Sequence, residues 1–299
     1  MTEEEFAGLV RQHERELRVH CYRMLGSLDE SQDLVQETFL RAWRGRAELR
    51  EEGRLRGWLY RIATNACLDF LERSPRPATL QPYPDRLLEP DAAAIDKETI
   101  ELAFIAAIQH LSAKERAVLI LRDVLGWSAR ETAELLGSSV GAVNSGLQRA
   151  RVTMRTRLPR RRLDWTPSAS AEERAVLQRY MSALERADEA AVAAVLREDA
   201  VAGHQAGAGG NEGSDAVRYE GRDVILKAWA PILGGGPELR FLPAYANRQP
   251  AAATYLRLPG GLSFEAFALS VLRVEDGAVA EIMTFGADLF PAFGLPGEL

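Results

Sequence analysis

The sequence predicts a multidomain chain with two all-α domains, the second containing a helix-turn-helix, followed by an α+β domain. Three observations predict this order. Apolar residues recur at helical spacing over residues 1–73 and again over 97–163, a proline-rich segment separates these stretches, and the last third ends in segments with strand character. With 299 residues, 46% of them hydrophobic, the chain can bury several cores, which excludes a disordered protein.

The first domain, residues 1–73, has the periodicity of three amphipathic helices that share one core. Their apolar positions fall within 6–25, 34–43 and 55–70. Thr2 with Glu5 and Ser27 with Glu30 have the spacing of capping boxes, in which a hydroxyl and a carboxylate satisfy the first backbone amides of a helix.

Residues 74–96 have little periodicity and are rich in proline, which predicts a linker. The prolines are Pro75, Pro77, Pro82, Pro84 and Pro90. Extended at about 3.1 Å per residue, this segment would span roughly 70 Å, so the domains on either side of it need not touch each other.

The second domain, residues 97–163, contains the helix-turn-helix. Ser128 begins a short helix that ends at Gly137, and after a very short turn Ser139 caps a second helix that runs from Val140 to about residue 157. In this motif the early residues of the second helix face base edges in the major groove, where Asn and Gln can each bind adenine through two hydrogen bonds. The residues expected to face the bases are Ser139, Gly141, Ala142, Asn144, Ser145 and Gln148.

Charge is segregated along the chain. The whole protein has a net charge of -6, yet residues 97–163 carry an excess of six basic residues, and residues 164–299 carry an excess of eight acidic ones. The basic block follows the base-facing residues and comprises Arg149, Arg151, Arg155, Arg157, Arg160, Arg161 and Arg162. Guanidinium groups at this density are typical of a surface that binds DNA phosphates.

The third domain covers about residues 170–290. Two helices are expected at 171–187 and 189–197, then a glycine-rich loop, a third helix near 222–233, and strands at 239–245, 252–258, 263–274 and 279–285. Turns at 259–261 and 275–277 make the last three strands an antiparallel meander. Helices followed by antiparallel strands indicate an α+β domain.

Two ordered blocks resemble the compact extracytoplasmic-function group of bacterial RNA polymerase sigma factors. The stretch DESQDLVQETFLRAW at 29–43, followed by GWLYRIATNACLD at 57–69, is similar to the first conserved domain of that group, sigma region 2. The stretch LSAKERAVL at 111–119, with the helix-turn-helix, is similar to the second, sigma region 4. The resemblance implies that region 2 binds core RNA polymerase and the -10 promoter element, and that region 4 binds the -35 element.

The resemblance also implies where the polymerase docks. The clamp helices of its largest subunit would bind along residues 33–43, with acidic and amide groups facing a basic coiled coil and Phe39 and Trp43 as anchors. The residues assigned to this contact are Asp33, Leu34, Gln36, Glu37, Phe39, Arg41 and Trp43.

In the same family, the third helix of region 2 captures the -10 element as its strands separate. Arg61, Asn65 and Asp69 follow one another at four-residue spacing, which places them on one stripe of that helix. Tyr60, Thr64 and Trp58 lie beside the stripe, and Trp58 is expected to pack in the core. Amide, hydroxyl and aromatic groups suit the capture of an unstacked base.

The third domain resembles the SnoaL-like cone fold. The resemblance rests on YMSALERAD at 180–188, YEGR at 219–222, the final meander and the closing DLFPAFGLP at 288–296. The cone encloses a pocket, and relatives include isomerases and cyclases that use a carboxylate base with an acid partner. The candidates here are His204, Asp215, Glu265 and Asp288, which no motif links. His204 is expected to be an ordinary loop residue, and its glycine-rich surroundings at 203–213 argue against a strand that lines a ligand pocket.

A sigma factor is therefore the leading hypothesis, with no enzymatic activity of its own and with no catalytic residue, metal or cofactor predicted. The acidic third domain is expected to contact the sigma domains and to modulate their activity, with a small ligand in its pocket left open. Two alternatives are an ordinary transcriptional regulator, which leaves residues 29–69 unexplained, and a SnoaL-like enzyme that carries a DNA-binding tether.

The sequence also predicts a cytoplasmic protein. Its first residues lack the basic and apolar regions of a signal peptide, and it has no uncharged apolar stretch of 18 residues. Cys21 and Cys67 lie in apolar helical patterns and are expected to be buried free thiols, as in a reducing compartment.

Overall fold

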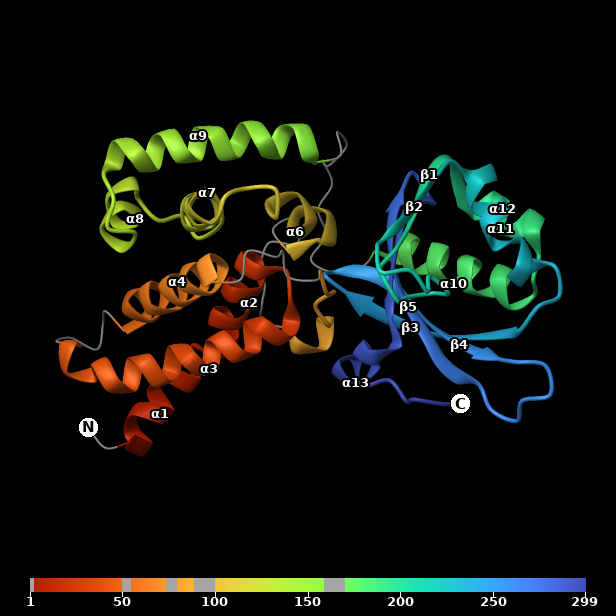
Figure 1. The fold of residues 1–299 in the computed structure, drawn as a ribbon, viewed down its shortest axis with the longest axis horizontal. Helices are drawn as coiled ribbons and strands as arrows, with labels where there is room; N and C mark the ends of the chain where they lie inside the picture. Colours follow the sequence, from red (N-terminus) through yellow and green to blue (C-terminus); the bar gives the residue numbers. More distant parts are fainter. Residues whose placement is uncertain (1–2, 50–54, 74–79, 89–99, 159–169) are drawn as a thin grey trace. The chain divides into compact units, whose positions relative to one another are not determined.

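The computed structural model describes residues 3–49, 55–73, 80–88, 100–158 and 170–299. The chain forms two compact units. Unit 1 comprises Met1–Pro82 and Glu98–Asp164, and unit 2 comprises Tyr83–Lys97 and Trp165–Leu299 (Figure 1).

The N-terminal part of unit 1 has four α-helices in its described residues where the periodicity predicts three. They are α1 (Glu3–Arg11), α2 (Glu14–Leu25), α3 (Leu28–Gly45) and α4 (Leu55–Arg73), with a short 3-10 turn, η1 (Arg46–Glu48), after α3. The apolar run over 6–25 is interrupted at His13. The break turns α1 so that Phe6 packs on Trp43 of α3, with ring centroids 5.5 Å apart, while α2 packs against both α3 and α4. A single straight helix over residues 6–25 would not place Phe6 on Trp43 and also pack against both α3 and α4.

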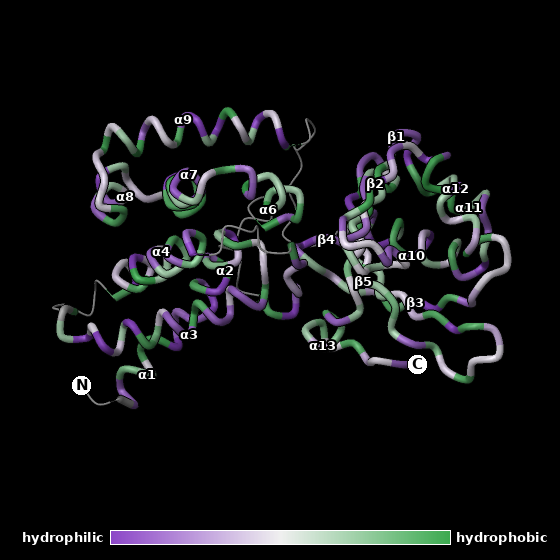
Figure 2. The backbone as a smooth tube through the Cα atoms, in the orientation of Figure 1, coloured by the Kyte–Doolittle hydropathy of each residue, from purple (hydrophilic) through white to green (hydrophobic). Residues whose placement is uncertain are grey.

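The C-terminal part of unit 1 confirms the predicted helix-turn-helix. Its helices are α6 (Leu102–Ile108), α7 (Ala113–Leu119), which continues into a π-helical turn η5 (Ile120–Val124), α8 (Ala129–Leu135) and α9 (Val140–Arg157). Complete capping boxes begin α7 and α8, at Ser112 with Glu115 and at Ser128 with Glu131. Hydrophilic and hydrophobic residues alternate along α9, as an amphipathic helix requires (Figure 2).

The two helical groups of unit 1 touch each other. The buried guanidinium of Arg116 in α7 donates hydrogen bonds to the carbonyl oxygens of Met24, at the end of α2, and of Gln109 and Leu111. Burial lowers the pKa of Arg116 to about 10, so the group remains charged at neutral pH. The ring of Trp127 packs edge-on against Tyr60 of α4 at 5.8 Å. The extended linker that the sequence predicts would allow these two helical groups to separate. In the structure they pack against each other.

The described part of the predicted linker is bound at both ends. In unit 1, Gln81 Oε1 accepts hydrogen bonds from the Ser27 hydroxyl and from the backbone amides of Leu28 and Asp29 at the start of α3, and Gly26 O accepts one from the Gln81 amide. Residues 83–88, including the 3-10 turn η3 (Asp85–Leu87), belong to unit 2. The free tether predicted over 74–96 is therefore wrong for residues 80–88, because its polar groups find specific partners.

Unit 2 is an α+β domain with a six-stranded sheet in the order β2-β1-β6-β5-β4-β3. The strands are β1 (Leu196–His204), β2 (Val217–Glu220), β3 (Glu238–Ala246), β4 (Gln249–Arg257), β5 (Glu265–Glu275) and β6 (Ala278–Gly286). The helices are α10 (Ala171–Glu185), α11 (Glu189–Val195), α12 (Arg222–Leu233) and α13 (Phe290–Phe293), with the 3-10 turn η6 (Ala287–Leu289) before α13. Ser170 and Glu173 form a complete capping box at the start of α10.

The sheet corrects the sequence prediction at its first two strands. Residues 196–204 were expected to end a helix and enter a loop, but they form β1, which pairs parallel to β6 and antiparallel to β2. Three consecutive charged residues, 197–199, break the alternation of apolar residues that signals a strand. Pairing on both edges supplies the hydrogen bonds that hold this segment extended. The predicted meander is confirmed and begins one strand earlier, at β3.

Candidate nucleic-acid and polymerase interfaces

The surface of α9 has the properties that DNA reading requires. The Ser139 hydroxyl accepts a hydrogen bond from the Ala142 amide at 3.1 Å and fixes the start of the helix. The opposite face is buried through Val143, Leu147, Ala150 and Met154. The residues predicted to face the bases are all exposed, and they are Ser139, Gly141, Ala142, Asn144, Ser145 and Gln148.

Two of the predicted phosphate-binding arginines are held by carboxylates. Arg149 Nε lies 2.7 Å from Glu115 Oε1, and this hydrogen bond is the main cause that lowers the pKa of Glu115. Arg151 binds both oxygens of Asp123, at 2.8 and 2.7 Å. These pairs connect α9 to α7 and η5, so both arginines help to hold the motif together. Arg155 and Arg157 are exposed, whereas residues 160–162 lie outside the described residues.

The predicted polymerase face of α3 is partly exposed. Asp33 and Gln36 are exposed and Glu37 is half-buried. Leu34, which was assigned to the contact, is only 9% exposed and faces the core, because it lies on the same side of the helix as the buried Val35 and Thr38. The prediction is wrong for this side chain.

Leu40 is an exposed apolar residue that the sequence analysis missed. It lies one turn after Gln36 and is 52% exposed. Periodicity gives no signal for such a residue, because an isolated leucine on the polar side of a helix is recognised only once the buried side is known. Its neighbours Asp33, Gln36 and Glu37 make it the apolar part of a polar surface.

The two aromatic anchors predicted on α3 are half-buried. Trp43 packs on Phe6, and the guanidinium of Arg46 lies 3.8 Å from the centre of the Trp43 ring. The tryptophan thus holds α1 against α3 in the protein as it stands. Phe39 has part of its ring open on the same helix.

The stripe on α4 is bonded to α3 by an ion pair. Arg61 and Asp69 are exposed and Asn65 is half-buried, as a polar stripe on a packed helix requires. Arg41 of α3 binds Asp69 Oδ2 at 2.7 Å and Glu37 Oε1 at 2.8 Å, and these contacts raise the pKa of Arg41. A residue predicted to bind polymerase and a residue predicted to bind DNA therefore share one salt bridge.

Tyr60 and Thr64 do not lie on the surface beside this stripe. Thr64 is 0% exposed, donates its hydroxyl hydrogen to Tyr60 O at 2.7 Å and contacts His20 Nε2 at 2.9 Å. Tyr60 is buried and donates to Glu16 at 3.1 Å, and burial raises the pKa of its phenol. Both side chains belong to the core between α2 and α4, so the surface beside the stripe does not include them.

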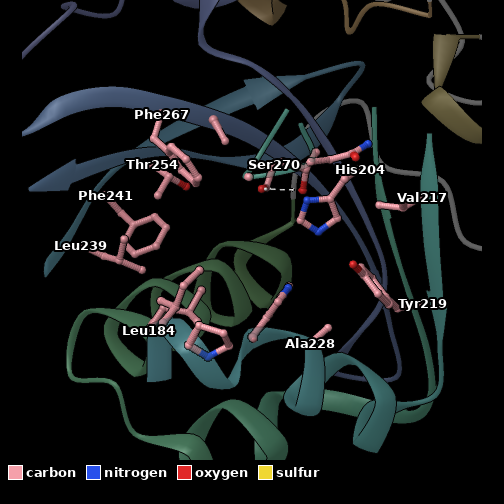
Figure 3. A pocket seen from close by; sticks show the side chains of 18 of the residues that line it. Leu184, His204, Val217, Tyr219, Ala228, Leu239, Phe241, Thr254, Phe267 and Ser270 are labelled. Carbon is pink, nitrogen blue, oxygen red and sulfur yellow. Dashed lines mark hydrogen bonds between the residues drawn. The ribbon is translucent and has the colours of Figure 1, made fainter. Parts of the chain in front are cut away.

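Unit 2 contains a cavity of about 360 Å³. Among the four titratable candidates, His204 lines this cavity (Figure 3), and Asp215, Glu265 and Asp288 do not. His204 ends β1 instead of lying in an ordinary loop, and residues 209–212 of the glycine-rich segment form part of the wall. The glycine-rich segment therefore helps to form the pocket, contrary to the prediction.

The described residues contain neither a candidate membrane span nor a candidate metal site. None of the helices in the described ranges is long and apolar enough to cross a membrane. In the same part of the chain, no cluster of three or more His, Cys, Asp or Glu side chains could hold a metal ion.

Comparisons with known proteins match all three parts of the chain. Family models match at residues 9–76 (Sigma-70 region 2), 101–154 (Sigma-70, region 4) and 177–282 (SnoaL-like domain). The ECF RNA polymerase sigma factor SigG of Mycobacterium tuberculosis is 37% identical over 99% of this chain and 85% of its own length. SigM of the same species is 30% identical over 50% of this chain and 74% of its own length.

A solved structure has the same fold along the whole chain. The crystal structure of the extracytoplasmic function sigma factor SigJ of Mycobacterium tuberculosis covers 99% of this chain and 100% of its own, with a TM-score of 0.66 at 22% identity. The match includes the C-terminal α+β domain with its mixed sheet.

Proposed function

This chain belongs to the extracytoplasmic-function (ECF) sigma factors of RNA polymerase, and we propose which of its parts bind the polymerase and which bind each promoter element. As a sigma factor it directs transcription initiation, with RNA polymerase and promoter DNA as its partners. The observation that carries this conclusion is the 37% identity to an ECF sigma factor over 99% of the chain.

Region 4 binds the -35 element through α9. Asn144 and Gln148 read base edges, Ser139 and Ser145 add hydroxyl contacts, and Gly141 lets the helix approach closely. Their exposure, and the burial of the opposite face, supports this role. Arg155 binds phosphate, with Arg149 and Arg151 contributing less because a carboxylate offsets each of them.

Region 2 uses α4 and α3 for two different partners. Arg61, Asn65 and Asp69 on α4 capture the -10 element. The exposed face of α3 binds the clamp helices of the largest polymerase subunit, and we assign Asp33, Gln36, Glu37, Phe39, Arg41 and Trp43 to it, with Leu40 as an added apolar contact. Leu40 supports this assignment because an apolar side chain in a polar surrounding is typical of a protein interface.

Promoter binding requires unit 1 to open. The two promoter elements are about 20 base pairs apart, or roughly 70 Å at 3.4 Å per base pair. The contacts of Arg116 and Trp127 hold the two helical groups together, so these contacts must break when both elements are bound. Residues 80–88 must then leave their present partners and extend.

The C-terminal SnoaL-like domain modulates the sigma factor by holding part of the linker. Asn247 Oδ1 accepts the Tyr83 amide at 2.7 Å, the Asn247 amide donates to Tyr83 O at 2.8 Å, and Asp85 Oδ1 accepts the Arg248 amide at 2.8 Å. Arg86 donates to Ala292 O at 2.7 Å. The proposed limits are therefore 1–73 for region 2, 97–163 for region 4 and 170–290 for the C-terminal domain, with residues 83–88 of the 74–96 linker bound to the last. We place the protein in the cytoplasm with its polymerase and assign it no enzymatic activity.

Run-off transcription with core polymerase and the full-length protein tests this function. Asn247 has a φ of 57°, so Asn247→Gly keeps the backbone conformation and the backbone hydrogen bond to Tyr83 O but removes the side-chain acceptor of the Tyr83 amide, whereas Asn247→Asp keeps that acceptor. We expect N247G to raise promoter-dependent transcript several-fold at matched concentration and N247D to resemble the parent. Equal activity of all three proteins contradicts the linker proposal, and no promoter-dependent transcript from the parent contradicts the sigma function itself.

A further inference from the structure

Both cysteines of the chain lie in unit 1, Cys21 on α2 and Cys67 on α4, and both are free thiols with 0% exposure, as the sequence predicts. The packing of α2 on α4 brings them together. His20 Nε2 lies 2.9 Å from Thr64 Oγ1, and this contact fixes the register of the two helices. Cys21 is the next residue on α2, and Cys67 lies one turn after Thr64 on the same side of α4.

The two thiols contact each other. A hydrogen bond with Cys21, together with burial, raises the pKa of the Cys67 thiol well above its usual value, so this thiol is protonated at neutral pH. Ala63 and Ala66 lie within one turn of Cys67 and are also fully buried. Small side chains at a contact let two helices lie closer together. The two sulfur atoms are therefore neighbours, as a disulfide between α2 and α4 requires.

Helix α7 of the second helical group packs on both α2 and α4 beside this pair. Its Arg116 donates a hydrogen bond to Met24 O, one turn after Cys21 on α2. The positive charge of Arg116 also partly opposes the rise in the Cys67 pKa, because it favours the thiolate. Arg116 is therefore close to both helices that carry the cysteines. Because neither thiol has exposed surface in this arrangement, an oxidant in solution does not reach the pair.

We propose that Cys21 and Cys67 are an oxidation site. A peroxide converts the two thiols to a disulfide that joins α2 to α4, and α7 shields the pair until the two helical groups of unit 1 separate. The shielding rests on the opening of unit 1 in the proposed function, whereas the disulfide itself does not. Disulfides in a reducing compartment are usually transient and redox-sensing, and this pair has the properties of such a site.

The reaction consumes one peroxide molecule for each chain. One cysteine loses its proton and attacks an oxygen of hydrogen peroxide, so that an S–O bond forms, the O–O bond breaks, and hydroxide leaves and takes up that proton. The second thiol attacks the sulfenic sulfur, so that the S–S bond forms, the S–O bond breaks and water leaves with the second thiol proton. Two water molecules are released. The two sulfurs together lose two electrons, and the peroxide gains them.

Peroxide treatment of the reduced full-length protein tests the site. Free thiols are blocked under denaturing conditions at successive times, and mass spectrometry measures the peptide pair linked through Cys21 and Cys67. We expect the linked pair to form slowly in the parent and to disappear on treatment with dithiothreitol. Absence of the linked pair, disulfides between chains in its place, or irreversible oxidation of each cysteine separately overturns the proposal.

Two variants that loosen the contact between the helical groups test the shielding. Trp127→Ala removes the ring contact with Tyr60, and Arg116→Lys keeps the charge but loses the hydrogen bond to Met24 O. Both should form the linked pair several-fold faster than the parent, and Trp229→Phe in unit 2 should match the parent. Urea unfolding of each reduced variant checks that it is folded. Equal rates in the parent and in both folded variants overturn the shielding.

Cys67→Ala assigns the pair. In this variant Cys21 should stop at the sulfenic acid, which dimedone traps, because the second thiol is absent. The disulfide should raise the urea midpoint of the parent, since it restricts the unfolded chain, and peroxide should leave the midpoint of C67A unchanged. A lower midpoint of the oxidised parent shows that the bond does not fit the fold and overturns the proposal. Run-off transcription by the reduced parent reports the sigma function separately, so failure of either proposal is recognised without the other.

Discussion

At the residue scale, the charged neighbours that a residue has along the sequence differ from those that it has in the folded protein. Arg149 and Arg151 belong to a block without acidic neighbours along the chain, yet Glu115 and Asp123 reach them from α7 and η5. Such pairs are tertiary contacts between residues 34 and 28 positions apart, and no local pattern reveals them. The exposed positions at the start of α9 could be predicted because the cap and the turn are local.

This pairing predicts unequal effects of two arginine substitutions. Arg155→Ala should lower affinity for promoter DNA and reduce the slope of log affinity against log salt by about 0.9, the value for one phosphate contact. Arg151→Ala should change the slope by less, since Asp123 neutralises that arginine before DNA arrives. Fluorescence anisotropy over a salt series measures both. A larger slope change for R151A than for R155A would contradict the argument.

His20 should make stability depend on pH. Burial, with the charge of Arg23, lowers its pKa to about 3 from 6.5, so below pH 6.5 the unfolded chain binds a proton that the folded chain does not. The free energy of unfolding should therefore fall by up to about 1.4 kcal/mol for each pH unit below 6.5, and be constant above it. Urea unfolding of the parent and of His20→Gln at pH 7, 6 and 5 checks this, because the difference between them isolates the histidine. A difference that is independent of pH rejects it.

At the element scale, prediction succeeded where the signal is local. Capping residues located the starts of α8 and α9, and turns located the meander of β4 to β6. It failed at β1, where pairing with β2 and β6 overrides a sequence without strand periodicity. That failure also hid His204, because the residue lines the cavity only once β1 exists.

The start of α3 depends on a residue of the linker. Gln81 Oε1 accepts two backbone amides of that helix, so Gln81→Ala should lower the stability of unit 1 by about 1 kcal/mol, the usual cost of losing a helix cap. It should also speed amide hydrogen exchange in the first turn of α3. Gln81→Glu keeps the acceptor but replaces the amide that donates to Asp29 Oδ2 at 2.8 Å with a carboxylate, so it should lie between the parent and Q81A. Unchanged exchange in Q81A would show that Ser27 alone is a sufficient cap.

At the scale of the whole molecule, the order of three domains could be predicted from sequence, and the packing of the helical groups within unit 1 could not. The length and composition of a linker set how far two domains can separate. Whether the domains associate depends on side chains such as Arg116 and Trp127, and no sequence motif signals their contacts. Single contacts between residues far apart in sequence are the least predictable feature of a fold.

Trp127→Ala should loosen unit 1. Loss of the ring contact with Tyr60 removes buried aromatic surface between the two groups, and spin labels on the outer faces of α4 and α8 should report longer and broader distances. Trp229→Phe, a substitution within unit 2, is the control for general effects of removing an indole. Identical distance distributions in the parent and W127A would show that other contacts suffice.

Arg41 links the charge that α3 presents to the charge that α4 presents. One guanidinium serves two carboxylates, Glu37 beside it and Asp69 across from it. A basic surface that binds Glu37 weakens the Arg41–Glu37 pair, so Arg41 then neutralises Asp69 more fully. In the same way, a basic surface that binds Asp69 strengthens the Arg41–Glu37 pair on α3. Under the proposed assignment of α3 to polymerase and α4 to DNA, binding of polymerase to α3 would therefore alter the charge that α4 presents to separated DNA strands, with no movement of the backbone.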